Sequence, residues 1–287
     1  MYRFVPQKRR SALRLKFGTA YFCARRQLAW LRWRNCFVRR PEADCIAEIR
    51  RTFPYHITRH ASPIFRNLSE EDTALQVGKA ANLALAAQCV SGAVLEPGRI
   101  FSYWRLIGNP TRRKGYQDGM MLLNGRPVAA VGGGLCALSN LIYWMTLHTP
   151  LFVAERFRHS YDVFPDVNRT RPFGSGATCV YNYRDLMIQN RTAVPYALVV
   201  WLEDGMLHGE WRSPYPAADI YEVYQKEHWI TSEAPGVYVR HNTIWRRHFV
   251  PGSDGSRILQ SDEYVTENHA LMMYEPLLES TCRNDEA

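Results

Sequence analysis

The chain has 287 residues, of which 46% are hydrophobic and 22% charged, and these ordinary globular values exclude a largely disordered chain. Its formal net charge of +9 is concentrated at one end, because residues 1–40 contain twelve Lys and Arg and no acidic residue, which leaves 24 basic and 27 acidic residues elsewhere. The body is therefore close to neutral. We expect no nucleic-acid partner, since a nucleic-acid-binding domain needs a basic face of its own.

The cysteine positions and the apolar segments indicate whether the protein holds a cofactor and in which cellular compartment it lies. Seven cysteines, at positions 23, 36, 45, 89, 136, 179 and 282, form no C-x-x-C pair and no Cys/His spacing typical of zinc, so we expect no metal and no other cofactor. Their odd number favours a reducing compartment over a disulfide framework. No membrane-spanning stretch and no clean signal peptide are expected, because Arg25 and Arg26 interrupt the N-terminal apolar residues. The predicted location is cytoplasmic.

The first forty residues are predicted to form a basic leader helix that is rich in aromatic residues. Its arginines alternate with large apolar side chains: Leu13, Leu15, Phe17, Tyr21, Phe22, Leu28, Trp30, Leu31, Trp33 and Phe37. Such a helix can lie peripherally on an anionic membrane, here the inner face, with its aromatic residues at the interface. The alternative is a helix that packs its aromatic side on the domain and keeps its arginines in water.

Residues 41–131 are predicted to combine helices with short strands. Pro41 ends the leader, and a helical turn at 44–51 precedes a loop over 54–68. The Ala- and Leu-rich segment 74–90 is strongly helical, with Ser69 as its candidate N-cap. Strands are expected at 94–95 and over the aromatic run 100–104. Segments 120–123 and 127–131 are predicted to pair as a hairpin around Asn124-Gly125.

The rest of the chain begins with a helix and then turns to strands. Apolar residues at helical spacing from Leu135 to Met145 predict a buried helix that ends at His148-Thr149-Pro150. Strands are expected at 152–157, 177–183, 186–188, 196–202 and 206–211, with a loop over 164–176, and mostly strands follow to the C-terminus. The predicted fold class is α+β, with a helical N-terminal part, a mixed α/β core around a buried Cys-bearing helix, and a β-rich C-terminal third. We predict a leader helix over 1–40, a core domain over 41–200 and a β-rich part over 201–287 that packs on the core.

The block Gly132-Gly133-Gly134-Leu135-Cys136 is the most distinctive motif. A cysteine at a helix N-terminus meets unpaired N–H groups and a positive partial charge, which favour a lowered pKa and a thiolate. A downstream histidine, His159, completes the order found in many cysteine acyl-transfer enzymes. The alternative is that Cys136 is a small side chain packed in a tight turn, since free cysteines are often buried.

Several motifs together resemble one known family. They are Glu96-Pro97-Gly98-Arg99-Ile100-Phe101-Ser102-Tyr103, the glycines at 108, 115, 119 and 125, the block from Gly132 through Cys136 to Ser139-Asn140, and Glu155-Arg156 with His159-Ser160. This set is similar to the VanW family, most strongly over residues 70–200. The family takes its name from an accessory gene of a glycopeptide-antibiotic resistance cluster. The resemblance therefore implies a link to antibiotic resistance and to cell-envelope or peptidoglycan biology, without an established reaction.

Two positions depart from the family pattern. Ala137 stands where members usually have Gln after the cysteine, and Gly176 stands where many have an Asp before Ala177-Thr178. If Cys136, His159 and that Asp form a triad, this chain lacks its third member and one oxyanion donor. Asp162, Asp166 or Asn182 could orient His159 instead, and the sequence does not choose among them.

The sequence leads to two functional hypotheses. In the first, the chain binds or processes a peptide or cell-wall precursor: Cys136 attacks a carbonyl, His159 moves the proton and the glycine-turn amides hold the oxyanion, as in a cysteine acyl-transferase or amide hydrolase. The candidate substrate-binding residues are Gly133, Gly134, Ser139, Arg156 and Ser160, with Arg156 suited to a carboxylate or phosphate. In the second, the chain is a non-catalytic binding or scaffold protein, and its association with a membrane surface is left open. The sequence leaves the oligomeric state open.

Overall fold

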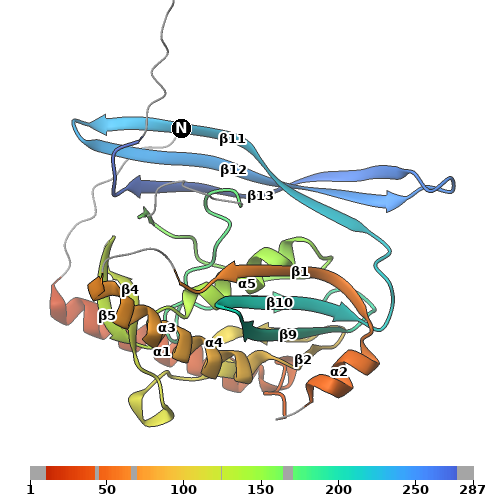
Figure 1. Ribbon diagram of the computed structural model, residues 1–287, viewed down its shortest axis with the longest axis horizontal. Helices are drawn as coiled ribbons and strands as arrows, with labels where there is room; N and C mark the ends of the chain where they lie inside the picture. Colours follow the sequence, from red (N-terminus) through yellow and green to blue (C-terminus); the bar gives the residue numbers. More distant parts are fainter. Residues whose placement is uncertain (1–10, 43–44, 66–69, 124, 164–170, 277–287) are drawn as a thin grey trace, which may run out of the picture.

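The structure is a computed structural model, and it describes residues 11–42, 45–65, 70–123, 125–163 and 171–276. Figure 1 shows a body of helices and short sheets with one long, narrow sheet lying across it. The fold class is confirmed as α+β, with helices in the N-terminal part and a strand-rich C-terminal part.

The body is organised on an antiparallel sheet whose strands come from both halves of the chain. Its order is β1 (Tyr55–Pro63), β10 (Met206–Ser213), β9 (Tyr196–Glu203) and β2 (Ala93–Leu95). Helix α5 (Cys136–Leu147) packs against β1 and β10, and α3 (Glu70–Val90) packs against β9. Because β9 runs through residue 200, segments on both sides of that predicted boundary share one sheet.

Two smaller sheets complete the body, one in contact with α5 and the other packed on α3. Strands β3 (Ile100–Ser102), β8 (Met187–Gln189) and β6 (Phe152–Glu155) form the first, with β8 in the centre and β6 in contact with α5. The predicted hairpin is confirmed as β4 (Asp118–Leu123) and β5 (Arg126–Val131), paired in antiparallel register, and β4 packs on α3. Residue 124 of its turn lies outside the described residues, as does Ser69, the candidate cap of α3.

The long sheet is built from the C-terminal strands. It comprises β11 (Ile220–Ala234), β12 (Val237–Pro251) and β13 (Arg257–Met272), with β7 (Tyr161–Asp162) parallel to the end of β13. Polar contacts tie it to the end of α5. His148 Nδ1 lies 2.9 Å from the Tyr221 carbonyl, and Arg246 Nη1 donates to the Thr149 carbonyl at 3.1 Å.

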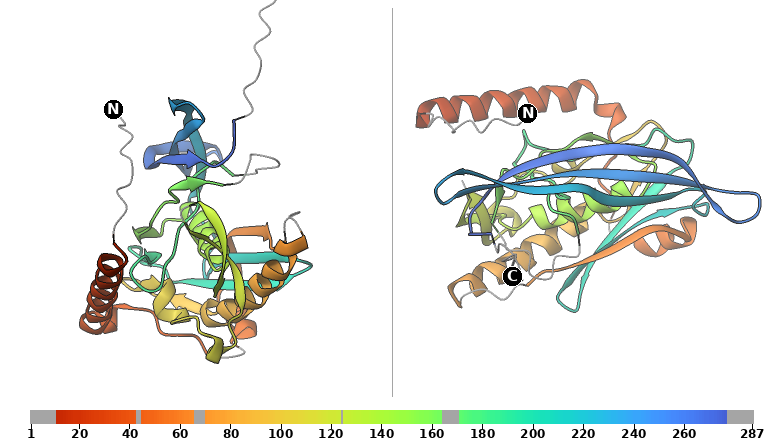
Figure 2. Two further views of the ribbon diagram at one scale, coloured as in Figure 1. Left: turned by 90° about the vertical axis from the view of Figure 1, so that its left-hand side faces the viewer. Right: turned by 90° about the horizontal axis from the view of Figure 1, so that it is seen from above.

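Three further helices complete the body. They are α1 (Ala12–Arg32), α2 (Ile46–Thr52) and α4 (Tyr103–Ile107), of which α4 is buried in the core, and short 3-10 turns lie at Arg34–Cys36 and Arg112–Lys114. Figure 2 shows α1 lying along the outside of the molecule, to one side of the long sheet and at a lower level than it. Within the described residues, no helix combines the length and the apolar character that crossing a membrane would require.

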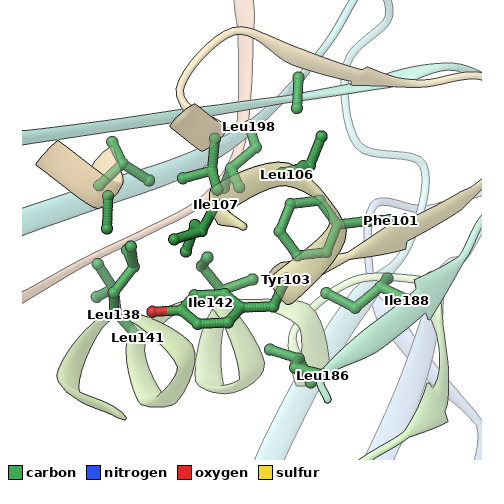
Figure 3. Packing of buried hydrophobic residues seen from close by; sticks show 14 of the residues in the cluster. Phe101, Tyr103, Leu106, Ile107, Leu138, Leu141, Ile142, Leu186, Ile188 and Leu198 are labelled. Atoms are coloured by element: carbon green, nitrogen blue, oxygen red, sulfur yellow. The ribbon is translucent and has the colours of Figure 1, made fainter. Parts of the chain in front are cut away.

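The core lies between α5, α4 and the strands around them. Figure 3 shows the Tyr103 ring between Leu138 and Ile142 of α5 on one side and, on the other, Ile188 of β8 and Leu186, which directly precedes that strand. The Tyr103 hydroxyl donates to the Leu135 carbonyl at 2.8 Å, so the start of α5 is fixed by a buried hydrogen bond. Such a bond is needed because a buried hydroxyl without a partner would be destabilising.

Three local predictions were wrong, two of them for a tertiary reason and one because of a local helix cap. Residues 54–68 were expected to be a loop, but 55–63 form the edge strand β1, whose ladder partner β10 lies far away in the sequence. The aromatic run turns helical at Tyr103, because the Ser102 hydroxyl accepts from the Arg105 N–H at 3.4 Å and caps α4. Residues 177–183 alternate in burial but form no strand: 177–179 are irregular and 181–183 form a turn, because Ser139 and Asn140 of α5 hydrogen-bond to the Ala177 backbone.

Candidate functional site

The triple glycine forms a tight turn between β5 and α5. Gly132 and Gly134 have φ of +76° and +89°, a region that residues with a side chain rarely adopt. A Cβ on Gly133 would lie 2.0 Å from the Gly119 carbonyl oxygen, so the turn packs directly on β4. Asn82 Nδ2 also donates to the Gly133 carbonyl at 3.0 Å. The glycines therefore allow close backbone packing that places Cys136 at the start of α5.

Cys136 is the first residue of α5 and is partly buried. Its Sγ lies 3.7 Å from the Cys179 carbonyl oxygen, to which the thiol donates. Burial raises the pKa of the Cys136 thiol above its ordinary value, against the smaller lowering effect of its backbone contacts. The expectation of a lowered pKa is therefore wrong, because loss of hydration outweighs the N-terminal position on the helix. At neutral pH this residue is a thiol.

His159 is held by two uncharged side chains. Its Nδ1 lies 2.8 Å from the Thr178 hydroxyl, and its Nε2 lies 3.3 Å from Asn140 Oδ1. Asn140 Oδ1 also accepts from the Ala177 N–H at 2.7 Å, so this oxygen is an acceptor and Nε2 carries the proton. Nδ1 then accepts from the Thr178 hydroxyl. Both ring nitrogens are thus engaged by groups other than the Cys136 thiol.

The environment of His159 makes it a weak base. Burial, and after it the charge of Arg156, lower the pKa of His159 to about 4. The chain Thr178–His159–Asn140 has the order of nucleophile, base and orienting residue. A base with this pKa, however, gives little driving force for removing a proton from a hydroxyl or thiol at neutral pH.

The residue that orients His159 is not among the three left open by the sequence. Asp162 is engaged by Arg240 Nε at 3.2 Å and by the Tyr274 hydroxyl at 2.7 Å. Asp166 lies outside the described residues, and the Asn182 side chain is buried with no hydrogen-bond partner. Asn140 takes the role instead. Asn140 lies one helical turn after Cys136. The Ser139-Asn140 motif was the sequence feature that could have identified it as the partner of His159.

Gly176 occupies a position beside the ring. A Cβ built on it would lie 3.1 Å from His159 Nε2 and 2.7 Å from Asn140 Oδ1. The position at which the family resemblance implies an Asp therefore borders the imidazole. In this chain no carboxylate projects from it, and Asn140 bonds the same nitrogen.

The other candidate residues have different surroundings. Ser139 is buried, and its hydroxyl donates to the Ala177 carbonyl at 2.8 Å, so it joins α5 to the segment that holds His159. Ser160 has an exposed side chain, and its carbonyl accepts from the Leu271 N–H at 3.2 Å. Cys136, Ser139, Asn140 and His159 thus gather around residues 177–179, whereas the Ser160 side chain faces solvent.

Arg156 lies next to this cluster and lines a pocket of about 280 Å³ with Tyr143, Leu147, Val153, Val265 and Thr266. Its hydrogen bonds go to uncharged acceptors: Nε to the Gly176 carbonyl at 2.9 Å, Nη1 to Thr266 Oγ1 at 3.0 Å, and Nη2 to the Gly174 carbonyl and to Asn268 Oδ1 at 3.4 Å. The guanidinium also lies 4.9 Å from the centre of the Tyr143 ring.

These bonds leave a single N–H of Nη1 without an acceptor among the described residues. Arg156 therefore cannot offer the bidentate fork expected from the sequence, but its positive charge meets no carboxylate of the described chain. As for metals, the described residues contain no cluster of three or more His, Cys, Asp or Glu side chains that could hold an ion.

Comparison with known proteins places this site in a family. Residues 78–212 match the family described as VanW like protein, a range that includes Cys136, Asn140 and His159. The chain is 31% identical over 188 residues to the Vancomycin B-type resistance protein VanW of Enterococcus faecalis, covering 66% of this chain and 68% of that protein. It is 30% identical over 114 residues to the uncharacterized protein YoaR of Bacillus subtilis, covering 40% and 36%. No solved structure matches significantly. The chain belongs to the VanW-like family.

Proposed function

We propose that this chain serves glycopeptide resistance at the cell envelope by binding, without covalent catalysis, a peptide or cell-wall precursor that carries a free carboxylate. The observation that carries the proposal is Arg156, a partly buried cation whose hydrogen bonds all go to uncharged groups and which lines a pocket. A buried charge without a counter-charge is costly, so a ligand carboxylate would be stabilised there. The Enterococcus relative is a vancomycin B-type resistance protein, which supports the link to the envelope.

The walls of the pocket suit a short peptide. Tyr143, Leu147, Val153 and Val265 provide apolar contact, and Thr266 and Arg156 provide polar groups at one side. Ligand sites commonly combine a mostly apolar lining with a few polar groups that fix the orientation of the ligand. A volume of about 280 Å³ accommodates the end of a peptide, so a terminal carboxylate would meet Arg156 while small side chains fill the apolar part.

Binding is preferred over acyl transfer because the cysteine is not activated. The Cys136 thiol has a raised pKa and donates to a backbone carbonyl, and both nitrogens of His159 are engaged by Asn140 and Thr178. Nucleophilic cysteines need the thiolate or an adjacent base. The catalytic alternative predicts that Cys136→Ser abolishes function in cells, whereas non-covalent binding predicts that the variant keeps both resistance and peptide affinity.

The binding test uses isothermal titration calorimetry with a synthetic peptidoglycan stem pentapeptide and its C-terminal amide. The free acid is expected to bind at least about tenfold more tightly, because an ion-paired hydrogen bond is worth about 1.5 to 3 kcal/mol. Val153→Phe would fill the pocket and weaken binding by a similar factor. Ala154→Phe is the matched control, because the neighbouring residue of β6 is exposed and faces away. Equal affinity for acid and amide, or unchanged binding by Val153→Phe, would overturn the proposal.

A further inference from the structure

Helix α1 turns its apolar side chains away from the protein. The residues that face outward include Leu13, Phe17, Tyr21, Leu28 and Leu31, which are between 62% and 74% exposed. At 3.6 residues per turn, their positions fall within an arc of roughly 80° around the helix axis. They therefore form one continuous stripe along a helix of 21 residues, which is about 30 Å long.

The opposite side of α1 is fixed to the body. Arg26 forms a partly buried ion pair with Glu155 of β6, and its Nη2 also donates to the Tyr183 carbonyl at 3.4 Å. Trp30 is buried, and the Phe22 ring lies 6.3 Å from that of Tyr183. These contacts determine which face points outward. The helix thus packs Arg26 inward beside Trp30 and Phe22 and turns a stripe of large apolar side chains outward, where an ordinary surface helix has polar residues.

Exposed cations border the stripe. Arg14, Arg25 and Arg32 follow one edge of it, and Lys16 lies near the other edge. Residues 1–40 contain no acidic residue that could neutralise them. Beyond the end of the helix, a pocket of about 530 Å³ continues the positive surface; its charged lining residues are Arg34, Arg39, Glu96 and Arg99.

We propose that α1 is a membrane-docking helix that lies flat on a bilayer containing anionic lipids, with its apolar stripe among the acyl chains and its arginines at the headgroups. An apolar face bordered by basic residues is the pattern of interfacial helices. The anionic leaflet that fits this charge is the cytoplasmic one. A second copy of the chain fits less well, because two such helices packed by their stripes would bring rows of arginines together without acidic partners.

The test is co-sedimentation of the full-length protein with vesicles. Binding is expected to vesicles with about 30 mol% phosphatidylglycerol and to be at least about tenfold weaker to pure phosphatidylcholine, since each basic residue near an anionic surface contributes roughly a fivefold factor. Raising the salt concentration from about 0.1 M to about 0.5 M is expected to reduce binding, because it screens surface charge. Equal binding to both kinds of vesicle, or to neither, would overturn the proposal.

Variants separate the stripe from apolar surface in general. The double variant Phe17→Ser/Leu28→Ser is expected to lower the partition coefficient by at least about tenfold, because each side chain buries apolar area in the bilayer. Ile258→Ser/Leu259→Ser is the matched control, since both residues are 51% exposed at the start of β13, and it is expected to bind as the wild type does. Unchanged circular dichroism would show that both variants fold. If the Phe17/Leu28 variant instead converts a dimer to a monomer with vesicle binding intact, the stripe is a protein interface and the proposal fails.

Discussion

Replacing His159 with glutamine is expected to reduce the loss of stability that acid causes. In the folded chain the pKa of His159 is lowered to about 4, mainly by burial, whereas in the unfolded chain it returns to about 6.5. Because the folded pKa lies below the unfolded one, the unfolded state takes up the proton first as the pH falls. His159 therefore leaves stability intact above about pH 6.5 and lowers it progressively down to about pH 4.

The two pKa values give the size of the effect. Protonation of His159 in the unfolded state lowers the free energy of unfolding by about 2 kcal/mol at pH 5 and by about 3 kcal/mol at pH 4. Glutamine does not titrate, and its amide can still donate to Asn140. At pH 7 the His159→Gln variant is expected to be less stable by about 1 to 3 kcal/mol, because the hydrogen bond from Thr178 is disturbed. The gap between the two proteins should then narrow by about 2 kcal/mol between pH 7 and pH 5.

The assay is urea unfolding of both proteins at pH 7, 6 and 5. The quantity compared is the free energy of unfolding extrapolated to water. Other titrating groups occur in both proteins and cancel in the difference, including His60, whose pKa is also lowered to about 4. A gap that stays constant within about 0.5 kcal/mol across this range would refute the account, because His159 would then titrate alike in both states.

Three further predictions concern the cysteine, the glycine turn and the leader helix. Iodoacetamide is expected to modify Cys136 at least about tenfold more slowly in the folded than in the urea-unfolded protein at pH 8, because its raised pKa keeps it a thiol; peptide mass spectrometry measures this, and rapid native labelling would contradict it. Gly133→Ala should lower the free energy of unfolding by at least about 2 kcal/mol, since its Cβ would lie 2.0 Å from a backbone oxygen. Gly18 lies in α1 with open space around it, so Gly18→Ala should raise the free energy of unfolding by about 0.5 to 1 kcal/mol. Urea unfolding measures both glycine variants, and an equal change in their free energies of unfolding would contradict these two predictions. Glu155→Gln leaves Arg26 without its carboxylate, so trypsin should cleave within α1 several-fold faster, and an unchanged rate would show that the ion pair does not hold the helix.

Much of the local structure could be predicted because its cause is local. The apolar spacing from Leu135 to Met145 places one face of α5 in the core, and the Asn-Gly turn closes the β4–β5 hairpin. Strand β1 could not be predicted, because its burial does not alternate and its hydrogen bonds come from β10, more than a hundred residues later. A pattern confined to neighbouring residues carries no information about such a partner.

The candidate site shows the same division. The sequence located Cys136 and His159, and the fold brings both to residues 177–179. The partner of His159 was missed, because three acidic or amide residues nearby in the sequence were considered and the amide four residues after Cys136 was not. The protonation state of Cys136 was also predicted wrongly, because the sequence indicated a lowered thiol pKa and burial raises it. A pKa depends on how much water surrounds a group, and burial is decided by packing.

By itself the sequence determined the basic leader, the helix that begins at Cys136, the α+β class and the membership of a VanW-like family, because these rest on composition, periodicity and local motifs. Only the tertiary structure decided that the leader helix faces outward with its apolar stripe, that the Cys136 thiol stays protonated, and that Asn140 and Thr178 hold His159. The reason is that orientation, hydration and hydrogen-bond partners are set by residues distant in the chain, here Glu155 for α1 and the 177–179 segment for α5.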